Sequence, residues 1–322
     1  MTHEDVPDDP LTPENEFKER TIENRFRVRR ARFKLTWRPE KWLTAVLQVG
    51  DFNERDFGIS LLRDAYLHIS PSRYIEVRVG QFKKPFSRIE LRSPGKLRVF
   101  KRGPGNDLLA EELRYGDRDL GIQLSGRIVP AMKLDYIIGV FNGSGPNISE
   151  KGNSKDINAR VKATVSRFFE LGINGAFKFF DDEEERGSTG WAVGADAVLK
   201  AAGFRTHLEG IIGTDHAFKS REIQVTDNAP GIFDVLAILS YKHTVSGSEP
   251  AIAVEPVFKF ELLDPNTKVT ADQVLVYSPG LNLYLGKYLR LMIHGELTRP
   301  SKNSAKRFPQ DELLAFQLCF DI

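Results

Sequence analysis

The sequence predicts an all-β protein made of antiparallel strands, each about ten residues long. Apolar and polar residues alternate along most of the chain, as in RRARFKLTW (29–37) and DINARVKATV (156–165). This period of two places successive side chains on opposite faces of a strand, one apolar and one polar. A helical period is found only at 104–114, and no run of about 18 apolar residues exists, which excludes a transmembrane helix.

Fifteen strands are expected in chain order, joined alternately by short and long connections. Their predicted ranges are 26–37, 42–51, 60–69, 74–81, 118–126, 132–142, 156–166, 170–180, 190–201, 204–214, 233–243, 251–262, 272–285, 288–298 and 311–320. Residues 1–24 are polar, contain proline breaks and show no period, so we expect a flexible tail there. The folded domain is therefore expected to span residues 25–322.

Two architectures accommodate so many alternating strands. A soluble sandwich buries the apolar faces against each other, whereas a transmembrane antiparallel β-barrel turns them toward lipid and lines a water-filled lumen with the polar faces. Aromatic residues at the strand ends favour the barrel, because aromatic girdles lie at both membrane interfaces. These residues are Trp37, Trp42, Tyr74, Phe168, Phe169, Phe179, Phe180, Trp191 and Phe204. The N-terminus does not read as a signal peptide, which is the best argument for the soluble alternative.

The composition and the motifs argue against several classes of function. With 46 basic and 44 acidic residues, the chain lacks the basic excess typical of nucleic-acid binding. The single cysteine, Cys319, excludes an internal disulfide and a cysteine-based zinc site. The sequence contains no nucleophile elbow, P-loop or metalloprotease motif, and the acidic run at 181–185 reads as a solvated loop. We expect no catalytic site, no metal and no cofactor.

Positive charge gathers in one stretch, FKKPFSRIELRSPGKLRVFKR (82–102), which holds eight Lys or Arg and a single Glu. Such a run is usually a solvated face. The alternative is a functional cluster, because rings of Arg and Lys are the expected device for an anion or phosphate pore. Arg contributes a planar fork suited to phosphate oxygens, and Lys contributes a point charge.

The order and spacing of several motifs resemble the phosphate-selective porin O and P family. The motifs are RRARFKL (29–35), RDAYL (63–67), VGQFKKPFS (79–87), RDLGIQLSG (118–126), YIIGVFNGSG (136–145), GLNLYLGKYLRLMIHGEL (280–297) and ELLAFQLCF (312–320). The resemblance covers about residues 25–322 and is densest at 25–145. The sequence departs from the pattern at its end, because Phe320 is two places before the last residue, Ile322, where such barrels often end in an aromatic residue.

The resemblance implies a sixteen-strand outer-membrane barrel that associates as a homotrimer and forms a water-filled, anion-selective channel for phosphate or polyphosphate-type anions. The sixteenth strand would then lie within 215–232 or 272–285. Implied partners are inorganic anions such as phosphate, outer-membrane lipid and lipopolysaccharide, with no nucleic acid. The chain given lacks a leader peptide for that location. A general, weakly selective porin, a structural outer-membrane barrel and a soluble β-sandwich binding module remain as alternatives.

On the same interpretation, the connection at 82–117 folds into the lumen as a constriction loop. The residues expected to line the constriction are Lys83, Lys84, Arg88, Arg92, Lys96, Arg98, Lys101 and Arg102. Those expected along the lumen wall are Arg30, Arg32, Lys34, Arg78 and Lys162. Lipid is expected to contact Ala31, Phe33, Leu35, Val161, Ala163, Leu291 and Ile293.

Overall fold

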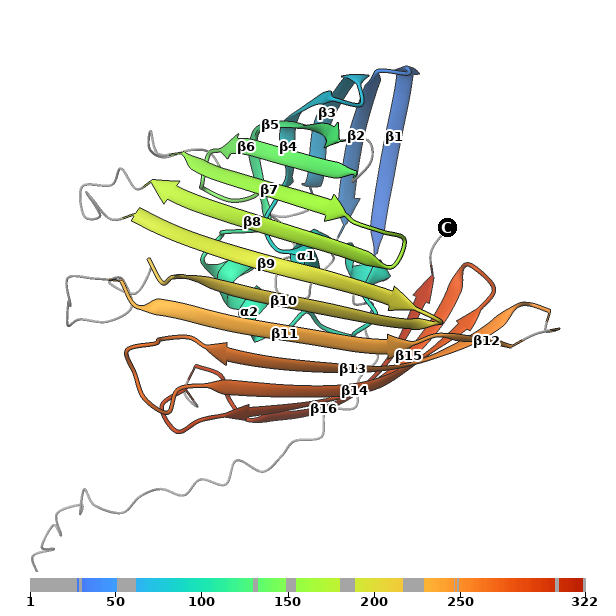
Figure 1. Ribbon diagram of the computed structural model, residues 1–322, viewed down its shortest axis with the longest axis vertical. Helices are drawn as coiled ribbons and strands as arrows, with labels where there is room; N and C mark the ends of the chain where they lie inside the picture. Colours follow the sequence, from blue (N-terminus) through green and yellow to red (C-terminus); the bar gives the residue numbers. More distant parts are fainter. Residues whose placement is uncertain are drawn as a thin grey trace, which may run out of the picture.

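The computed structural model describes residues 28, 31–50, 62–129, 133–148, 155–179, 189–216, 229–245, 247, 249–304 and 307–320. The strands are β1 (Arg32–Glu40), β2 (Leu43–Gly50), β3 (Leu62–Ser72), β4 (Ile75–Lys83), β5 (Arg118–Val129), β6 (Leu134–Phe141), β7 (Asp156–Thr164), β8 (Phe169–Phe179), β9 (Thr189–Ala201), β10 (Phe204–Thr214), β11 (Gly231–Tyr241), β12 (His243–Val245), β13 (Ile252–Asp264), β14 (Val274–Leu285), β15 (Leu289–Pro300) and β16 (Asp311–Phe320). All belong to one curved sheet (Figure 1).

The sheet follows the order of the chain. Strands that are neighbours in sequence pair antiparallel from β1 to β11 and from β13 to β16, β11 pairs with β13, and the short β12 pairs with β13 beside it. Each of the fifteen predicted strands overlaps one observed strand, and β12 is the sixteenth. Range 272–285 holds the single strand β14, and 217–228 lies outside the described residues.

Apolar side chains are exposed on the convex face of the sheet, and polar side chains are buried on the concave face. In β7, Asp156, Asn158 and Arg160 are buried, whereas the intervening Ile157 and Val161 are exposed. A soluble sandwich requires the opposite arrangement, because its apolar faces form the core. The predicted all-β barrel architecture with sixteen antiparallel strands is confirmed, and the apolar convex face is the one expected to contact lipid.

The side chains expected to contact lipid follow this pattern. Phe33 is 67% exposed and Leu35 54% exposed, and Ala31 and Val161 are also exposed. The other three, Ala163, Leu291 and Ile293, are half-buried. On β15, the residues that flank Leu291 and Ile293 are buried on the concave side; they are Arg290, Met292 and His294.

A positive charge on the middle of the convex face should destabilise the barrel. Ile173 lies halfway along β8 and is 63% exposed. We expect Ile173→Arg to lower the free energy of unfolding by about 2–4 kcal/mol, the value for Arg at the bilayer midplane. Urea titration of the barrel in lipid vesicles measures this change. The control Phe168→Arg, in the turn before β8, should change it by less than about 1 kcal/mol, and equal effects of the two would contradict the assigned depth.

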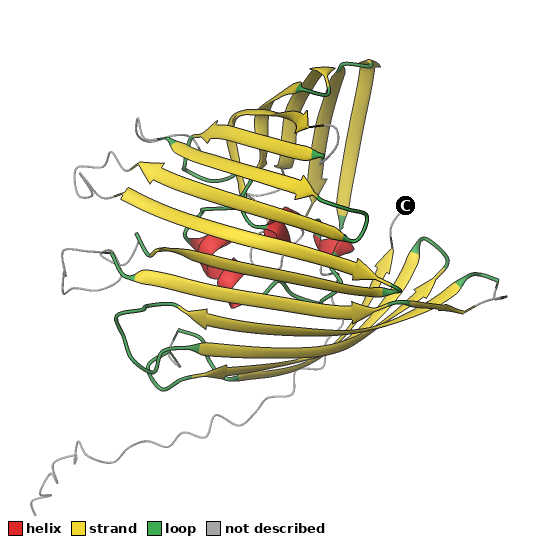
Figure 2. Cartoon of the chain, viewed as in Figure 1, coloured by secondary structure: helices red, strands yellow, loops and turns green. Residues whose placement is uncertain are grey.

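The connection between β4 and β5 carries helical turns on the concave side of the sheet (Figure 2). They are α1 (Arg88–Leu91), the 3₁₀ turn η1 (Pro94–Lys96), α2 (Pro104–Asn106) and the π-helical turn η2 (Asp107–Glu112). The helical segment predicted at 104–114 is therefore confirmed as α2 and η2. Within the described ranges, no helix is long and apolar enough to cross a membrane.

Candidate functional site

The site is built around residues 84–117, which we call the inner loop. The loop follows β4 and returns to β5, and Lys83 and Arg118 are register partners where the two strands meet. Its first turn, α1, begins after Ser87, whose Oγ accepts a hydrogen bond from the backbone N–H of Glu90 at 3.2 Å. The predicted inward-folded loop is therefore observed.

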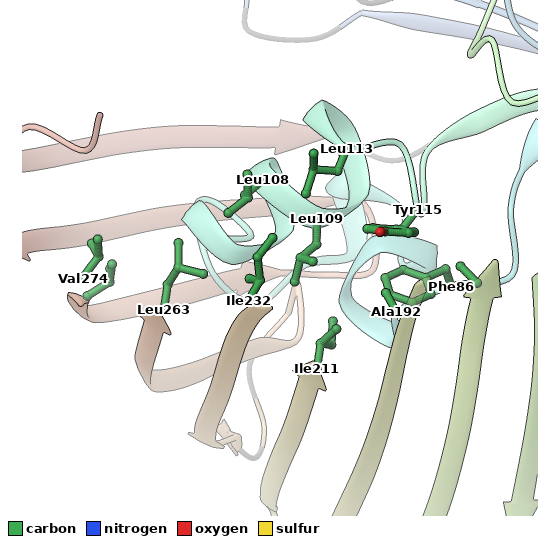
Figure 3. Close-up of a cluster of buried hydrophobic side chains, with 12 residues drawn as sticks. Phe86, Leu108, Leu109, Leu113, Tyr115, Ala192, Ile211, Ile232, Leu263 and Val274 are labelled. Carbon is green, nitrogen blue, oxygen red and sulfur yellow. The ribbon is translucent and has the colours of Figure 1, made fainter. Parts of the chain in front are cut away.

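Apolar side chains hold the inner loop against the concave face of β8–β14. Phe86, Leu108, Leu109, Leu113 and Tyr115 are each less than 2% exposed, and they pack on apolar wall residues, as Figure 3 shows. The wall residues of this cluster are Ala176, Ala192, Ile211, Ile232, Leu263, Val274 and Val276. A second cluster joins Ile89, Leu97 and Val99 of the loop to Leu236, Ile238 and Val257 of the wall. The burial of these apolar side chains stabilises the position of the inner loop against the wall.

Wall side chains also bind the backbone of the inner loop. The Glu209 carboxylate accepts hydrogen bonds from the N–H groups of Arg88 at 2.7 Å and Ile89 at 3.0 Å. Glu261 accepts from the N–H of Gly105 at 2.7 Å. A Cβ at position 105 would lie 2.3 Å from the Asp234 carboxylate, so a larger residue there would require the Asp234 side chain to move. These contacts fix both helical parts of the loop to the wall.

Two of the predicted constriction cations are buried inside the protein. Lys84 is completely buried, and its Nζ lies 2.8 Å from Asp156 Oδ2 and donates to the carbonyl oxygen of Arg114. Arg102 is 9% exposed and lies 3.3 Å from Glu90 Oε2. Burial by itself raises the pKa of Glu90, but the charges of Lys83 and Arg102 outweigh it and lower the pKa.

Four further cations of the run are paired with carboxylates. Lys83 binds Glu90 of the loop, and the other three bind carboxylates of the barrel wall. Arg88 contacts Asp196 and lies 2.9 Å from Glu170, Arg98 lies 2.8 Å from Glu255, and Lys101 lies 3.4 Å from Glu296. A paired cation contributes little net field to the lumen, because the carboxylate offsets its charge.

The remaining two cations, Arg92 and Lys96, form no ion pair with any residue that the structure describes. Lys96 is exposed, and Arg92 is half-buried. Burial, followed by the charges of Arg98 and Arg88, lowers the pKa of Arg92. A guanidinium surrounded by others of the same sign is stabilised by an incoming anion.

A cavity of about 570 Å³ lies between the inner loop and the opposite wall, and we call it the lumen opening. Its lining comes from the inner loop and from β1–β6. The basic residues of the lining are Arg32, Arg73, Arg78, Lys83, Arg118 and Arg127, and the acidic residues are Asp64, Glu76 and Asp135. The lining thus holds six cations and three carboxylates.

The carboxylates of the lumen opening are paired with particular partners. Arg118 lies 2.8 Å from Asp64, Arg127 lies 2.6 Å from Asp135, and Glu76 lies 3.2 Å from His68. These contacts satisfy all three acidic side chains on the wall. The field that remains in the opening therefore comes from cations without a carboxylate partner.

Arg78 is such a cation. Its guanidinium carbon lies 4.7 Å from the centre of the Tyr66 ring and 5.2 Å from that of Phe82. In the described part of the chain no carboxylate lies within ion-pair distance of Arg78, and its buried Nε has no hydrogen-bond partner. Stacking on the two rings holds the guanidinium in place, and Arg78 is one of the residues that line the lumen opening.

The predicted wall residues are found in different settings. Arg32 and Arg78 line the lumen opening. Lys162 lies 2.9 Å from Asp135, and Lys34 is exposed and is the register partner of Gln48, which lines the opening. Arg30 and the acidic run at 181–185 lie outside the described residues.

Three basic lining residues were missed by the sequence analysis: Arg73, Arg118 and Arg127. They stand singly at the ends of strands and in a turn, so no local run marks them. Only the pairing of β3, β4 and β5 brings them to one opening. In the described ranges, no group of three or more His, Cys, Asp or Glu is placed to hold a metal ion.

Comparison with solved structures finds outer-membrane porins. An anion-selective porin from Comamonas acidovorans is 12% identical, with a TM-score of 0.58 and coverage of 91% of this chain and 85% of that chain. The trimer form of OmpT from Vibrio cholerae is 10% identical, with a TM-score of 0.56 and coverage of 90% and 87%. The channel DcaP of Acinetobacter baumannii is 10% identical, with a TM-score of 0.57 and coverage of 90% and 82%.

Comparison with curated protein sequences finds no match. The sequence profile named phosphate-selective porin O and P matches residues 12–197, more than half of the chain. The match begins within the segment 1–24 that the sequence analysis expects to be a tail, and that segment lies outside the described residues. Fold and profile together identify a channel of the bacterial outer membrane, and the chain belongs to the phosphate-selective porin O and P family.

Proposed function

We propose that this porin is an anion-selective diffusion channel and that small anions of the phosphate type pass through the lumen opening. The observation that carries the proposal is the lining of six cations and three carboxylates, with Arg78 free of any carboxylate among the described residues. A narrow passage lined by one sign of charge focuses the field and raises the local concentration of counter-ions. The family profile and the anion-selective structural neighbour support the same conclusion.

The basic run of the inner loop has two roles in this proposal. Lys84, Arg88, Arg98 and Lys101 tie the loop to the barrel through wall carboxylates. The unpaired cations of the run then add to the field of the lumen opening. Several moderate sites in series let an anion enter and leave, whereas a single tight site would trap it.

Reversal potential in a planar bilayer tests the proposal. With a KCl gradient across the bilayer, the reversal potential should have the sign of chloride selectivity, and its magnitude should fall as salt rises because screening shortens the range of the fixed charges. Replacement of chloride by phosphate should preserve the sign. A reversal potential near zero at low salt would instead establish a general, weakly selective porin.

We also propose that the barrel assembles as a homotrimer whose convex face contacts outer-membrane lipid and lipopolysaccharide. The structural neighbour OmpT is described in a trimer form, and the convex face of this chain exposes large apolar side chains such as Leu314, Phe316 and Leu318, each 66–67% exposed. Chemical cross-linking in native membranes should give a ladder that ends at three subunits. A ladder that ends at one subunit would refute the trimer.

Selectivity should depend on pH near neutrality through Glu111. Partial desolvation, followed by the charges of Glu90 and Asp107, raises the pKa of this half-covered inner-loop carboxyl to about 7. Between about pH 8 and pH 6, Glu111 therefore gains a proton and the inner loop loses a negative charge. We expect the anion-to-cation permeability ratio to rise by about twofold over this interval, as one screened surface charge allows.

The variant Glu111→Gln should remove most of this pH response. Glu112→Gln is the matched control, because Glu112 is its exposed neighbour and lies 3.1 Å from Arg307. The control should keep the wild-type response. An undiminished response in Glu111→Gln would show that another group titrates in this interval.

A further inference from the structure

The lumen opening has an apolar side as well as a charged one. The inner-loop residues that line it are Pro85, Leu91, Ser93 and Pro94, and none of them carries a charge. On the barrel wall, Ile137 lines the same opening, and the Tyr66 and Phe82 rings lie under Arg78. Anionic solutes that pass here therefore meet both cations and apolar side chains.

This arrangement favours a solute with two chemically different parts. A small hydrated anion such as phosphate gains nothing from the apolar side, and loses hydration where that side is close. A carboxylate attached to an apolar ring can place its oxygens on guanidinium groups and its ring against Leu91, Pro94 and Ile137, removing apolar surface from water. The cavity of about 570 Å³ has the size typical of small-molecule sites.

We propose that the lumen opening binds small organic carboxylates that carry an apolar ring, with Arg78 receiving the carboxylate and Leu91 and Ile137 contacting the ring. Arg78 lines the opening, is stacked on the Tyr66 and Phe82 rings and has no carboxylate partner among the described residues, so its planar guanidinium suits the two carboxylate oxygens. This inference rests on the proposed anion channel and adds a class of solute to it.

Block of ion current through single reconstituted channels tests this site. Benzoate, acetate and inorganic phosphate serve as probes, each added to KCl at low concentration. Benzoate should block at a concentration at least about fivefold lower than acetate, which has the carboxylate but no ring. Leu91→Ser and Ile137→Ser should each reduce this preference by about threefold and leave block by phosphate unchanged.

Two further variants complete the design. Arg78→Gln should weaken block by benzoate and acetate together, because it removes the group that receives the carboxylate. Ile148→Ser is the matched control, because Ile148 is an exposed apolar residue after β6 that does not line the cavity. It should keep the wild-type preference. Heat-induced unfolding of the purified Leu91→Ser and Ile137→Ser variants shows whether the barrel is intact.

The outcomes separate this inference from the proposed function. Equal block by benzoate and acetate in the wild type, or a preference that survives both serine variants, overturns the ring site while chloride selectivity still stands. A wild-type channel without chloride selectivity overturns the proposed function. In that case, a benzoate preference lost on Leu91→Ser would still support the binding site.

Discussion

A channel that carries Glu209→Ala is expected to conduct more current and to select less between anions and cations than the wild type. The Glu209 carboxylate accepts two backbone N–H groups at the start of α1, at 2.7 and 3.0 Å, and its side chain is 3% exposed. Hydrogen bonds to a charged group contribute about 1.5–3 kcal/mol each. Loss of both weakens the docking of the loop by about 3 kcal/mol, so the loop leaves the wall part of the time.

Single-channel recordings should show this release as brief steps to a higher conductance. Glu209→Gln keeps one acceptor oxygen and should give an intermediate effect. The control is Glu312→Gln, because Glu312 forms an exposed ion pair with Arg299 at 2.8 Å, and such pairs contribute at most about 1 kcal/mol. Heat-induced unfolding of each purified variant shows whether the barrel itself is intact. A Glu209→Ala channel with wild-type conductance would mean that the apolar clusters and the remaining polar contacts hold the loop without Glu209.

The strands could be predicted from the sequence because the alternation of apolar and polar residues within a strand reflects the two environments of its faces. In β7, each residue already shows by its polarity which face of the sheet it occupies. The three-residue β12 was missed, because three residues are too few to show a period. The same holds for α1, whose four residues are fixed by Ser87 and by the distant Glu209 rather than by a local apolar pattern.

The roles of individual cations could not be predicted, because their partners are far away in sequence. Arg98 and Glu255 are separated by 157 positions, and Arg88 and Glu170 by 82. The sequence analysis recognised a dense basic run but had no means to see which wall carboxylates would meet it. In the structure, wall carboxylates form ion pairs with several of these cations. The many positive charges of the loop therefore complement the negative charges of the wall on which the loop docks.

The cations of the lumen opening, by contrast, come from separate parts of the chain. Arg78 of β4 has no carboxylate partner among the described residues, whereas Arg118 and Arg127 of β5 are paired with Asp64 and Asp135. The antiparallel register of β3, β4 and β5 places these arginines, and Arg73 of the turn before β4, on one wall. The stretch of sequence richest in positive charge is therefore not the part of the fold that supplies most cations to the lumen opening. This difference makes Arg78 the most informative residue to change.

Replacement of Arg78 by glutamate should sharply reduce anion preference without disturbing the barrel. The lining now holds six cations and three carboxylates, and the variant would hold five and four. A unit charge about 6 Å from an ion in water contributes about 0.7 kcal/mol, so a change of two charges corresponds to about 1.4 kcal/mol, or about tenfold in permeability ratio before screening. With a Debye length of about 10 Å at 0.1 M salt, a three- to tenfold fall in the permeability ratio is expected, and at 1 M salt the effect should nearly vanish.

Reversal potentials at both salt concentrations measure this fall. Arg299→Glu is the control, because Arg299 undergoes the same charge change but does not line the opening. An equal fall for the two variants would show that net charge alone, rather than the position of Arg78 in the passage, sets the selectivity.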